Sequence, residues 1–286
     1  MIPTDYGVDV IIKEKGTGEY FENYDRESVF NLPKVTKPVD KRLNFSVFDV
    51  DLEVNEFNRD EFLFAAKTLL SKIDTSDINT PSNYLFFDKE NVYCVTQSMV
   101  SVLKNTVYEN IEREFSILGK VVDSLVKMLD STEDSIGIVF QENLLLFKTT
   151  NYIIVYNIPQ MRSQKMVLQK LLSSEWQKAF ANDNVLLNAV IKRAGIMGEK
   201  LEFIINPQIS EVEIKTTNNK FKHSLNLVKS NITENESFSL NIKILENAIL
   251  KNETYIIIRI GDGRLKVMDT TGLWSSFINF EKSLSG

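Results

Sequence analysis

The sequence predicts an α+β fold that occurs twice in the chain, each copy with two helices packed on antiparallel sheets. The first observation is an internal repeat, because Phe115–Ser124 and Phe238–Asn247 share, without a gap, Phe, Ser, an aliphatic residue, Lys, two aliphatic residues, an acid and a small polar residue. The offset is a constant 123 residues, which indicates two copies of one domain rather than a short-period repeat. The second observation is that strand and helix periodicities follow the same order in both halves.

Composition limits the class of protein. The 286 residues suffice for two domains with separate cores. The 33 Lys and Arg residues against 39 Asp and Glu residues give a net charge of −6, so nucleic-acid binding would need a segregated basic surface. The single cysteine, Cys94, excludes an internal disulfide framework and favours a reducing compartment. We find no secretory signal and no apolar run that could span a membrane, and we therefore expect a cytoplasmic protein.

Residues 1–42 are interpreted as an N-terminal extension with one short strand at Val8–Ile12. We expect a partly ordered tail, and the functional alternative is a partner-binding or subunit-contact arm.

The first domain is expected at residues 43–160. Apolar and acidic residues alternate from Phe48 to Val54, which predicts a half-buried strand. Asn58 is the expected N-cap of a helix, whose apolar face runs from Phe62 to Ile73. A strand through Ile111 and Arg113 then leads to Phe115, which opens a second helix with an apolar face from Leu118 to Leu129. The other expected strands are Tyr84–Phe87, Val92–Thr96, Met99–Leu103, Ile136–Phe140, Leu144–Lys148 and Tyr152–Ile158.

The second domain, residues 182–286, repeats this order after a connector at 161–181. The connector carries an apolar cluster at Met166–Leu172. A first helix is expected from Asn182 to Gly195, and Phe238 is expected to open the second helix, which continues through Ile249. The expected strands are Leu201–Ile205, Val212–Lys215, Phe221–Val228, Tyr255–Ile260, Leu265–Met268 and Trp274–Phe280.

The sequence shows no arrangement typical of a catalytic or metal site, and we expect no enzyme activity, no cofactor and no metal. His223 lies on a predicted strand and is interpreted as an ordinary exposed or edge histidine, with a general base as the alternative. Cys94 lies on another strand and is interpreted as a buried structural thiol. Gly261-Asp262-Gly263 joins two apolar strands as a hairpin turn, because no helix follows it as a nucleotide fingerprint requires.

Basic residues concentrate on the four predicted helices. They carry nine basic residues against five acidic ones, an excess of four that leaves −10 for the rest of the chain. Such a surface could hold phosphates by charge, although lysine on a solvated helix face is also normal for any soluble protein. The basic residues are Arg59, Lys67, Lys72, Lys120, Lys127, Lys192, Arg193, Lys243 and Lys251, and the acidic ones are Asp60, Glu61, Asp123, Asp183 and Glu246.

The duplicated order of strands and helices, with Phe238-Ser239-Leu240-Asn241 before the last helix, resembles the DNA sliding clamps of replication over about residues 45–281. The resemblance implies a processivity factor that encircles duplex DNA without sequence specificity and tethers the replicative polymerase. It implies a ring of six domains built as a homotrimer. The DNA-facing residues it implies are Lys67, Lys120, Lys127, Lys192, Arg193, Lys243 and Lys251.

The resemblance also implies that a DNA polymerase and a clamp loader bind through short apolar peptides near the connector, around Pro159–Leu172. Similar two-domain folds in viral processivity factors act as monomers or dimers, and the divergent sequence favours a viral or phage source.

The alternative from a different class is a virion structural or assembly protein, built from a duplicated β-rich module without a DNA role. The direction in which the seven basic residues point separates these hypotheses. An enzyme with a pocket at His223 or at a carboxylate cluster is the third.

Overall fold

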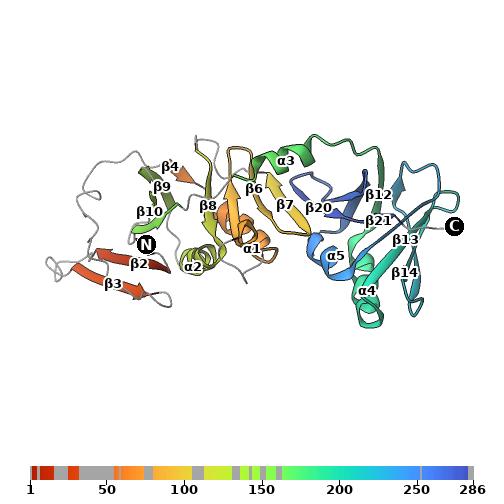
Figure 1. The fold of residues 1–286 in the computed structure, drawn as a ribbon, viewed down its shortest axis with the longest axis horizontal. Helices are drawn as coiled ribbons and strands as arrows, with labels where there is room; N and C mark the ends of the chain where they lie inside the picture. Colours follow the sequence, from red (N-terminus) through yellow and green to blue (C-terminus); the bar gives the residue numbers. More distant parts are fainter. Residues whose placement is uncertain are drawn as a thin grey trace. The chain divides into compact units, whose positions relative to one another are not determined.

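The structure is a computed structural model that describes residues 2–4, 7–15, 25–31, 55–57, 59–73, 80–104, 113–130, 136–141, 144–148, 153–158, 163–251 and 253–282. It is α+β, as predicted, with antiparallel sheets (Figure 1). None of the described helices is long and apolar enough to cross a membrane.

The chain divides into two compact units. Unit 1 comprises Met1–Lys67, Phe87–Glu90 and Asn105–Met161, and unit 2 comprises Thr68–Phe86, Asn91–Lys104 and Arg162–Gly286. This grouping differs from the predicted domains because strand β7 pairs with strand β20 and therefore belongs to the C-terminal unit. The domain boundaries at 43–160 and 182–286 follow the sequence repeat and stay a prediction.

Unit 1 contains two antiparallel sheets and the helical face of interest. One sheet has the order β1-β2-β3 and the other the order β11-β10-β9-β4. In the second sheet, Leu146 lies opposite both Val139 and Val155, and the three buried side chains form a small core cluster. The strands are β1 (Ile2–Thr4), β2 (Gly7–Lys15), β3 (Asp25–Asn31), β4 (Asn55–Phe57), β8 (Phe115–Leu118), β9 (Ile136–Gln141), β10 (Leu144–Lys148) and β11 (Ile153–Asn157).

Two helices complete this part of the chain, α1 (Arg59–Leu70) and α2 (Gly119–Asp130). Phe62 of α1 packs against Phe87 and Phe147, with ring centroids 6.2 and 6.5 Å apart. Phe87 in turn stacks on Phe115 at 4.8 Å. Aromatic rings bury large apolar areas, so this cluster fixes α1 against the strands and leaves its polar side chains at the surface.

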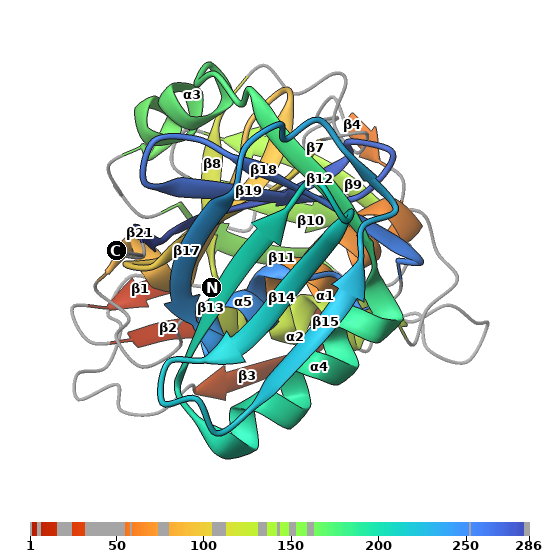
Figure 2. The same ribbon diagram turned by 90° about the vertical axis from the view of Figure 1, so that its right-hand side faces the viewer.

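Unit 2 is built on two antiparallel sheets. The first runs β16-β12-β18-β19-β20-β7-β6-β5, and the second runs β15-β14-β13-β17-β21, four strands of which lie side by side in Figure 2. The strands are β5 (Tyr84–Phe87), β6 (Asn91–Val95), β7 (Met99–Lys104), β12 (Lys178–Asp183), β13 (Lys200–Asn206), β14 (Glu211–Thr216), β15 (Lys222–Asn226), β16 (Lys229–Ser230), β17 (Glu236–Asn241), β18 (Tyr255–Ile260), β19 (Arg264–Met268), β20 (Trp274–Asn279) and β21 (Glu281–Lys282). A short 3-10 helix, η2 (Pro81–Asn83), precedes β5.

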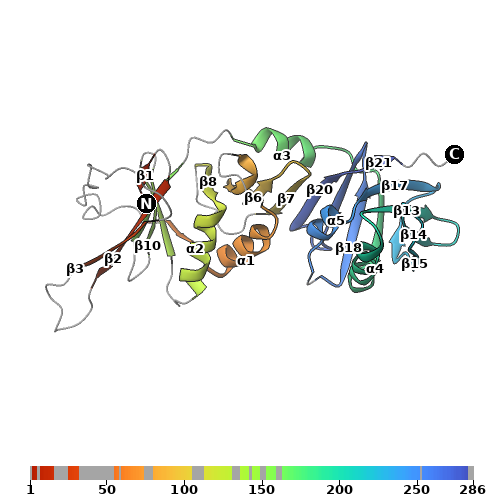
Figure 3. The same ribbon diagram turned by 60° about the horizontal axis from the view of Figure 1, so that its bottom comes forward.

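Helices α4 (Asn184–Met197) and α5 (Ile242–Ala248) pack together on the core of unit 2 (Figure 3). The core cluster takes Leu187, Ile191 and Ala194 from α4, and Ile242 and Leu245 from α5. The strands supply alternate residues to it, as the period of two requires. Each helix therefore buries one face in the core and exposes the other.

The repeated motif begins in a strand rather than opening a helix, which corrects the prediction. Phe115 lies in β8 and Phe238 in β17, and the helices α2 and α5 begin afterwards, at Gly119 and Ile242. These first helical residues are again 123 apart in number, so the repeat is present in the structure. Buried alternation in β17 decides the assignment, since Phe238 and Leu240 both point into the core.

The region assigned to the connector contains two unpredicted elements. The apolar cluster forms the helix α3 (Lys165–Leu172), and the strand β12 begins at Lys178, within the predicted connector. The described residues of the N-terminal extension form three strands rather than one, and β2 includes the expected strand at Val8–Ile12. The strand at 48–54, the N-cap at residue 58 and the strand residue at 111 lie outside the described residues. Arg113, predicted in the same strand as residue 111, lies in a bend before β8.

Candidate nucleic-acid interface

The helices of unit 1 expose all three of the lysines predicted there. Helix α2 buries Val121, Val122 and Leu125 against the core, and this leaves Lys120 and Lys127 on its opposite, solvent-facing side. Lys67, in the last turn of α1, is also exposed. The periodicity of 3.6 residues that predicted the apolar stripe therefore predicted the polar face as well.

Two of these three lysines are held by carboxylates of the same surface. Lys67 Nζ lies 2.7 Å from Asp130 Oδ1 at the end of α2, and Lys127 Nζ lies 2.6 Å from Asp123 Oδ2 one turn earlier. Lys120 makes no ion pair within the described part of the chain. The positive field of this surface is consequently weaker than a count of its lysines indicates.

Arg59 is not free to contact a ligand, because it caps helix α2. Its Nε and Nη2 atoms donate to the carbonyl oxygen of Leu129 at 2.8 and 2.6 Å, and its Nη1 pairs with Asp60 at 3.0 Å. A cation at this position satisfies a terminal carbonyl and interacts favourably with the helix dipole. The role of Arg59 is thus structural.

In unit 2, Lys192 and Arg193 lie on the exposed face of α4, between residues that the core buries. The side chain of Asp183 caps the start of this helix by accepting a hydrogen bond from the Leu186 N–H at 2.9 Å. Lys243 is exposed in the first turn of α5, which Asn241 caps. Among the described residues of unit 2, no ion pair involves Lys192, Arg193 or Lys243.

Lys251 lies beyond its predicted helix. Helix α5 ends at Ala248, and Ile249 turns into an extended conformation, so Lys251 is an exposed turn residue. Lys72 likewise follows α1 rather than belonging to it. With the observed bounds, these four helices carry seven basic and five acidic residues, and the excess is two rather than four: Arg59, Lys67, Lys120, Lys127, Lys192, Arg193 and Lys243 against Asp60, Glu61, Asp123, Asp130 and Glu246.

Lys72 is the most perturbed cation of the described residues. Burial lowers its pKa to about 8, with the charge of Lys251 acting in the same direction and the Cys94 thiol opposing it. Its Nζ donates to the Ile249 carbonyl oxygen at 3.4 Å and lies 5.8 Å from the centroid of the Trp274 ring. Lys72 thus caps the end of α5, and it does not belong to the exposed set.

The two residues weighed for catalysis, His223 and Cys94, lie on different strands of unit 2. His223 is exposed on the edge strand β15, opposite Ile214, and Cys94 is fully buried. Burial raises the pKa of the Cys94 thiol to about 12, which opposes formation of the nucleophilic thiolate. Within the described ranges, no group of three or more His, Cys, Asp or Glu residues could hold a metal ion. The predicted hairpin turn joins β18 and β19, and Gly263 in this turn has a φ of +66°, which favours glycine.

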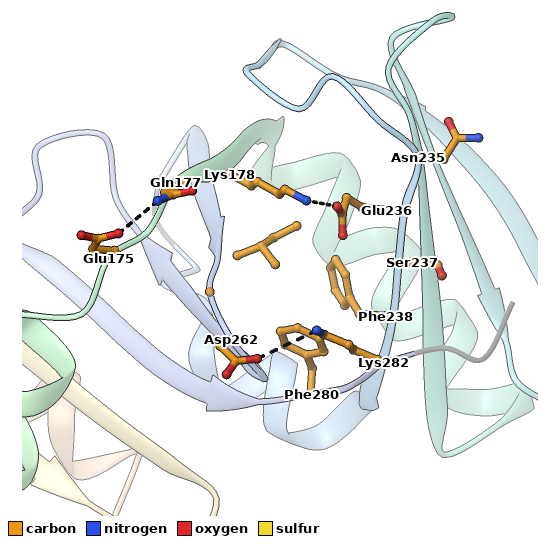
Figure 4. Close-up of a pocket in the computed structure, with 12 residues that line it drawn as sticks. Glu175, Gln177, Lys178, Asn235, Glu236, Ser237, Phe238, Asp262, Phe280 and Lys282 are labelled. Atoms are coloured by element: carbon orange, nitrogen blue, oxygen red, sulfur yellow. Dashed lines mark hydrogen bonds and ion pairs between the residues drawn. The ribbon is translucent and has the colours of Figure 1, made fainter.

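A pocket of about 450 Å³ opens in unit 2 between the beginning of β12, the β18–β19 turn and the C-terminal strands. Figure 4 shows the ring of Phe238 between two ion pairs, Lys178 with Glu236 and Lys282 with Asp262. The Phe280 ring packs against that of Phe238. Sequence reasoning did not find this pocket, because its residues come from four separate strands and turns. Ligand pockets in proteins commonly combine an apolar lining with a few polar groups that orient the ligand.

No protein-family model and no curated protein matches the sequence. Solved structures match closely in architecture. The DNA polymerase sliding clamp of Pseudomonas aeruginosa superposes with a TM-score of 0.69 at 10% identity, over 91% of this chain and 73% of that one. The chain has the sliding-clamp fold.

Two further structures agree on this fold. The DNA polymerase sliding clamp of Bacillus subtilis matches with a TM-score of 0.70 at 14% identity, over 90% of this chain and 70% of that one. The beta clamp of Helicobacter pylori, bound to a DNA ligase peptide, matches with a TM-score of 0.66 at 12% identity, over 96% of this chain and 76% of that one. At these identities the likeness concerns the backbone, so the function of the clamp-fold chain has to be argued from its own residues.

Proposed function

We propose that the chain is a DNA sliding clamp, a processivity factor that encircles duplex DNA and tethers a polymerase rather than catalysing a reaction. The observation that carries this proposal is the sliding-clamp fold over 91% of the chain. The exposure of all seven predicted basic residues supports it, because a surface that reads only the phosphate backbone needs accessible cations and no base-specific pocket. It would act in the cytoplasm, or in the host cytoplasm for a viral or phage protein.

The proposal includes a homotrimer, because three two-domain subunits would supply the six domains of the ring that the resemblance implies. Light scattering at several protein concentrations tests this. A stable mass of three chains supports the ring, whereas a monomer or dimer favours an open processivity factor. A large open-ended assembly would favour a virion structural protein and would contradict the clamp.

Encirclement itself is tested by retention on DNA. The chain, placed on nicked circular plasmid by its loader, should stay bound at a salt concentration that screens simple phosphate contacts, and should leave when the plasmid is cut to a linear form. Release at the same rate from circular and linear DNA would contradict encirclement.

Reversing Lys120 and Lys243 to Glu should leave folding intact and reduce processive synthesis, because it places negative charge beside the phosphates.

We further propose that a partner peptide binds unit 2 beside the connector helix α3. This helix exposes the apolar side chains Met166 (80% exposed), Val167 and Leu172, and the pocket at Phe238 and Phe280 begins shortly after it in the chain. The H. pylori clamp, which has the same fold, was solved with a DNA ligase peptide. A Met166→Glu/Val167→Glu variant should keep its retention on circular DNA and lose polymerase stimulation, and unchanged stimulation would exclude α3.

A further inference from the structure

Two ion pairs of unit 1, Lys67–Asp130 and Lys127–Asp123, lie on the surface proposed to meet DNA. The Lys67–Asp130 pair is half-exposed on both sides, with side chains 49% and 50% exposed, and the Lys127–Asp123 pair is 73% and 51% exposed. Each carboxylate is therefore open to solvent, so an approaching phosphate meets it together with the lysine that it holds. A phosphate that binds either lysine must displace the carboxylate or share the lysine with it, and the carboxylate is a group of the same charge as the phosphate.

Helix stability does not explain Asp130. This residue ends α2, where the helix dipole disfavours a negative charge. The end of the helix is already capped by Arg59, which donates to the Leu129 carbonyl. Exposed pairs such as these contribute little to folding. Folding therefore does not account for Asp130, whereas Asp123 also supports α2 through its i,i+4 pair with Lys127.

Unit 2 shows the opposite arrangement. Lys192, Arg193 and Lys243 are exposed, and no ion pair holds any of them among the residues that the structure describes. Unit 1 thus carries a neutralised basic surface on α1 and α2, and unit 2 carries on α4 and α5 cations that are available to phosphates.

We propose that Asp123 and Asp130 lower the affinity of the unit 1 surface for the DNA backbone by competing with phosphate for Lys127 and Lys67. The inference rests on the proposed DNA-binding function and adds its regulation to it. Weak contacts on one part of the interface would let the protein move along DNA, while Lys192 and Arg193 supply the stronger phosphate contacts. Because exposed ion pairs have coupling energies of a few tenths to about 1 kcal/mol, removing each carboxylate should raise affinity roughly 1.5- to 5-fold.

The test compares the full-length chain with an Asp123→Asn/Asp130→Asn variant. The probe is a fluorescein-labelled duplex of arbitrary sequence, and its anisotropy is measured over a series of salt concentrations. We expect roughly 2- to 20-fold tighter binding at low salt, and a salt dependence of log K that is steeper by up to about 2, since each new phosphate contact adds about 0.9. Thermal melting by circular dichroism checks that both proteins are folded.

A matched control separates this effect from a change in net charge. Glu90→Gln/Glu234→Gln removes the same two negative charges from exposed sites outside the helices. Binding by the Asp123→Asn/Asp130→Asn variant that is no tighter than binding by this control would overturn the proposal. Adding Lys67→Ala and Lys127→Ala to the Asp123→Asn/Asp130→Asn variant should abolish its gain in duplex affinity. That result would support the proposal, because the carboxylates are proposed to act only through those lysines.

A third variant distinguishes failure of this inference from failure of the proposed function. Lys192→Ala/Arg193→Ala should weaken DNA binding more than Lys67→Ala/Lys127→Ala does, and should flatten the salt dependence by about 2. If the wild type binds DNA and loses binding in this variant, yet the Asp variant gains nothing, only the inference is wrong. If neither the wild type nor any variant binds the duplex, the inference is wrong, and retention on circular plasmid decides the DNA-binding function separately.

Discussion

Replacing Lys72 by Met should stabilise the protein at neutral pH. The lysine is partly buried between the end of α5, the Trp274 ring and the Cys94 strand, and burial lowers its pKa from 10.5 to about 8. Below pH 8 the folded protein must therefore keep a desolvated ammonium group, whereas the unfolded chain solvates it fully. Methionine has a similar length, fills irregular space and carries no charge.

The magnitude follows from the difference between the two pKa values. A lowering of about 2.5 corresponds to roughly 3 kcal/mol at about 1.36 kcal/mol per pKa unit. Water still reaches the group, so about 1–2 kcal/mol is the realistic penalty. Loss of the long hydrogen bond to Ile249 and of the contact with Trp274 subtracts several tenths of a kcal/mol. We expect a net gain of about 1 kcal/mol at pH 7.

The direction of the Lys72 pKa shift fixes how the stability difference between wild type and variant changes with pH. Between pH 8 and 10.5 the unfolded wild-type chain binds more protons than the folded one, so wild-type stability rises with pH in this window. The advantage of Lys72→Met should be complete below pH 8 and should disappear by about pH 10.5. Urea unfolding at pH 7, 9 and 10 measures it, with the exposed Lys89→Met as control. A variant that is less stable than wild type by the same amount at every pH would refute the reasoning.

Three further variants test individual contacts. Ser276→Ala should lower the free energy of unfolding in urea by about 1–2 kcal/mol, because it leaves the buried Ser101 hydroxyl, which lies 2.7 Å from Ser276 Oγ, without its partner. The double variant Ser101→Ala/Ser276→Ala should lose less stability than the two single variants together, and additive losses would contradict this. Asp183→Ala should lower the free energy of unfolding by about 1 kcal/mol through loss of the α4 cap. The control Asp262→Ala, at an exposed turn residue, should lower it by no more than about a few tenths of a kcal/mol, and equal losses would show that the cap does not stabilise α4. Gly261→Ala places a Cβ 3.1 Å from the Trp176 ring, so the ring must shift; in a Trp274→Phe background its fluorescence maximum should move, and an unchanged spectrum would count against this packing.

The fold could be predicted where local patterns agree with the packing. The bounds of β5, β10 and β18 follow directly from apolar runs or alternation flanked by polar turns. The repeated Phe-Ser motif was assigned to helices because its aliphatic residues continue into the helical stripe, and only the pairing of Phe238 with Phe203 across β13 and β17 shows the strand. Periodicity also extended α5 to Ile249, since this residue remains buried after the helix has ended.

The candidate site was predictable in part. Exposure of Lys120 and Lys127 follows from the α2 stripe, and the Asp123–Lys127 pair is four residues apart, a spacing that sequence alone indicates. The Lys67–Asp130 pair joins residues 63 apart, and only the fold brings them together. The same holds for the pocket, whose Phe238 and Phe280 rings meet at 5.3 Å from different strands.

The pairing of β7 with β20 has a consequence for biosynthesis. Ser101 and its partner Ser276 are separated by 175 residues, so a ribosome adding 5–20 residues per second makes β20 roughly 10–35 s after β7. During that interval the nascent chain carries an apolar strand with an unpaired edge, which is a template for aggregation. Slower synthesis prolongs the exposure, and a chaperone that covers Met99–Leu103 would shorten it. Production of intact protein should therefore depend on how nascent chains are handled, and a fragment that stops before β20 would carry the exposed edge permanently.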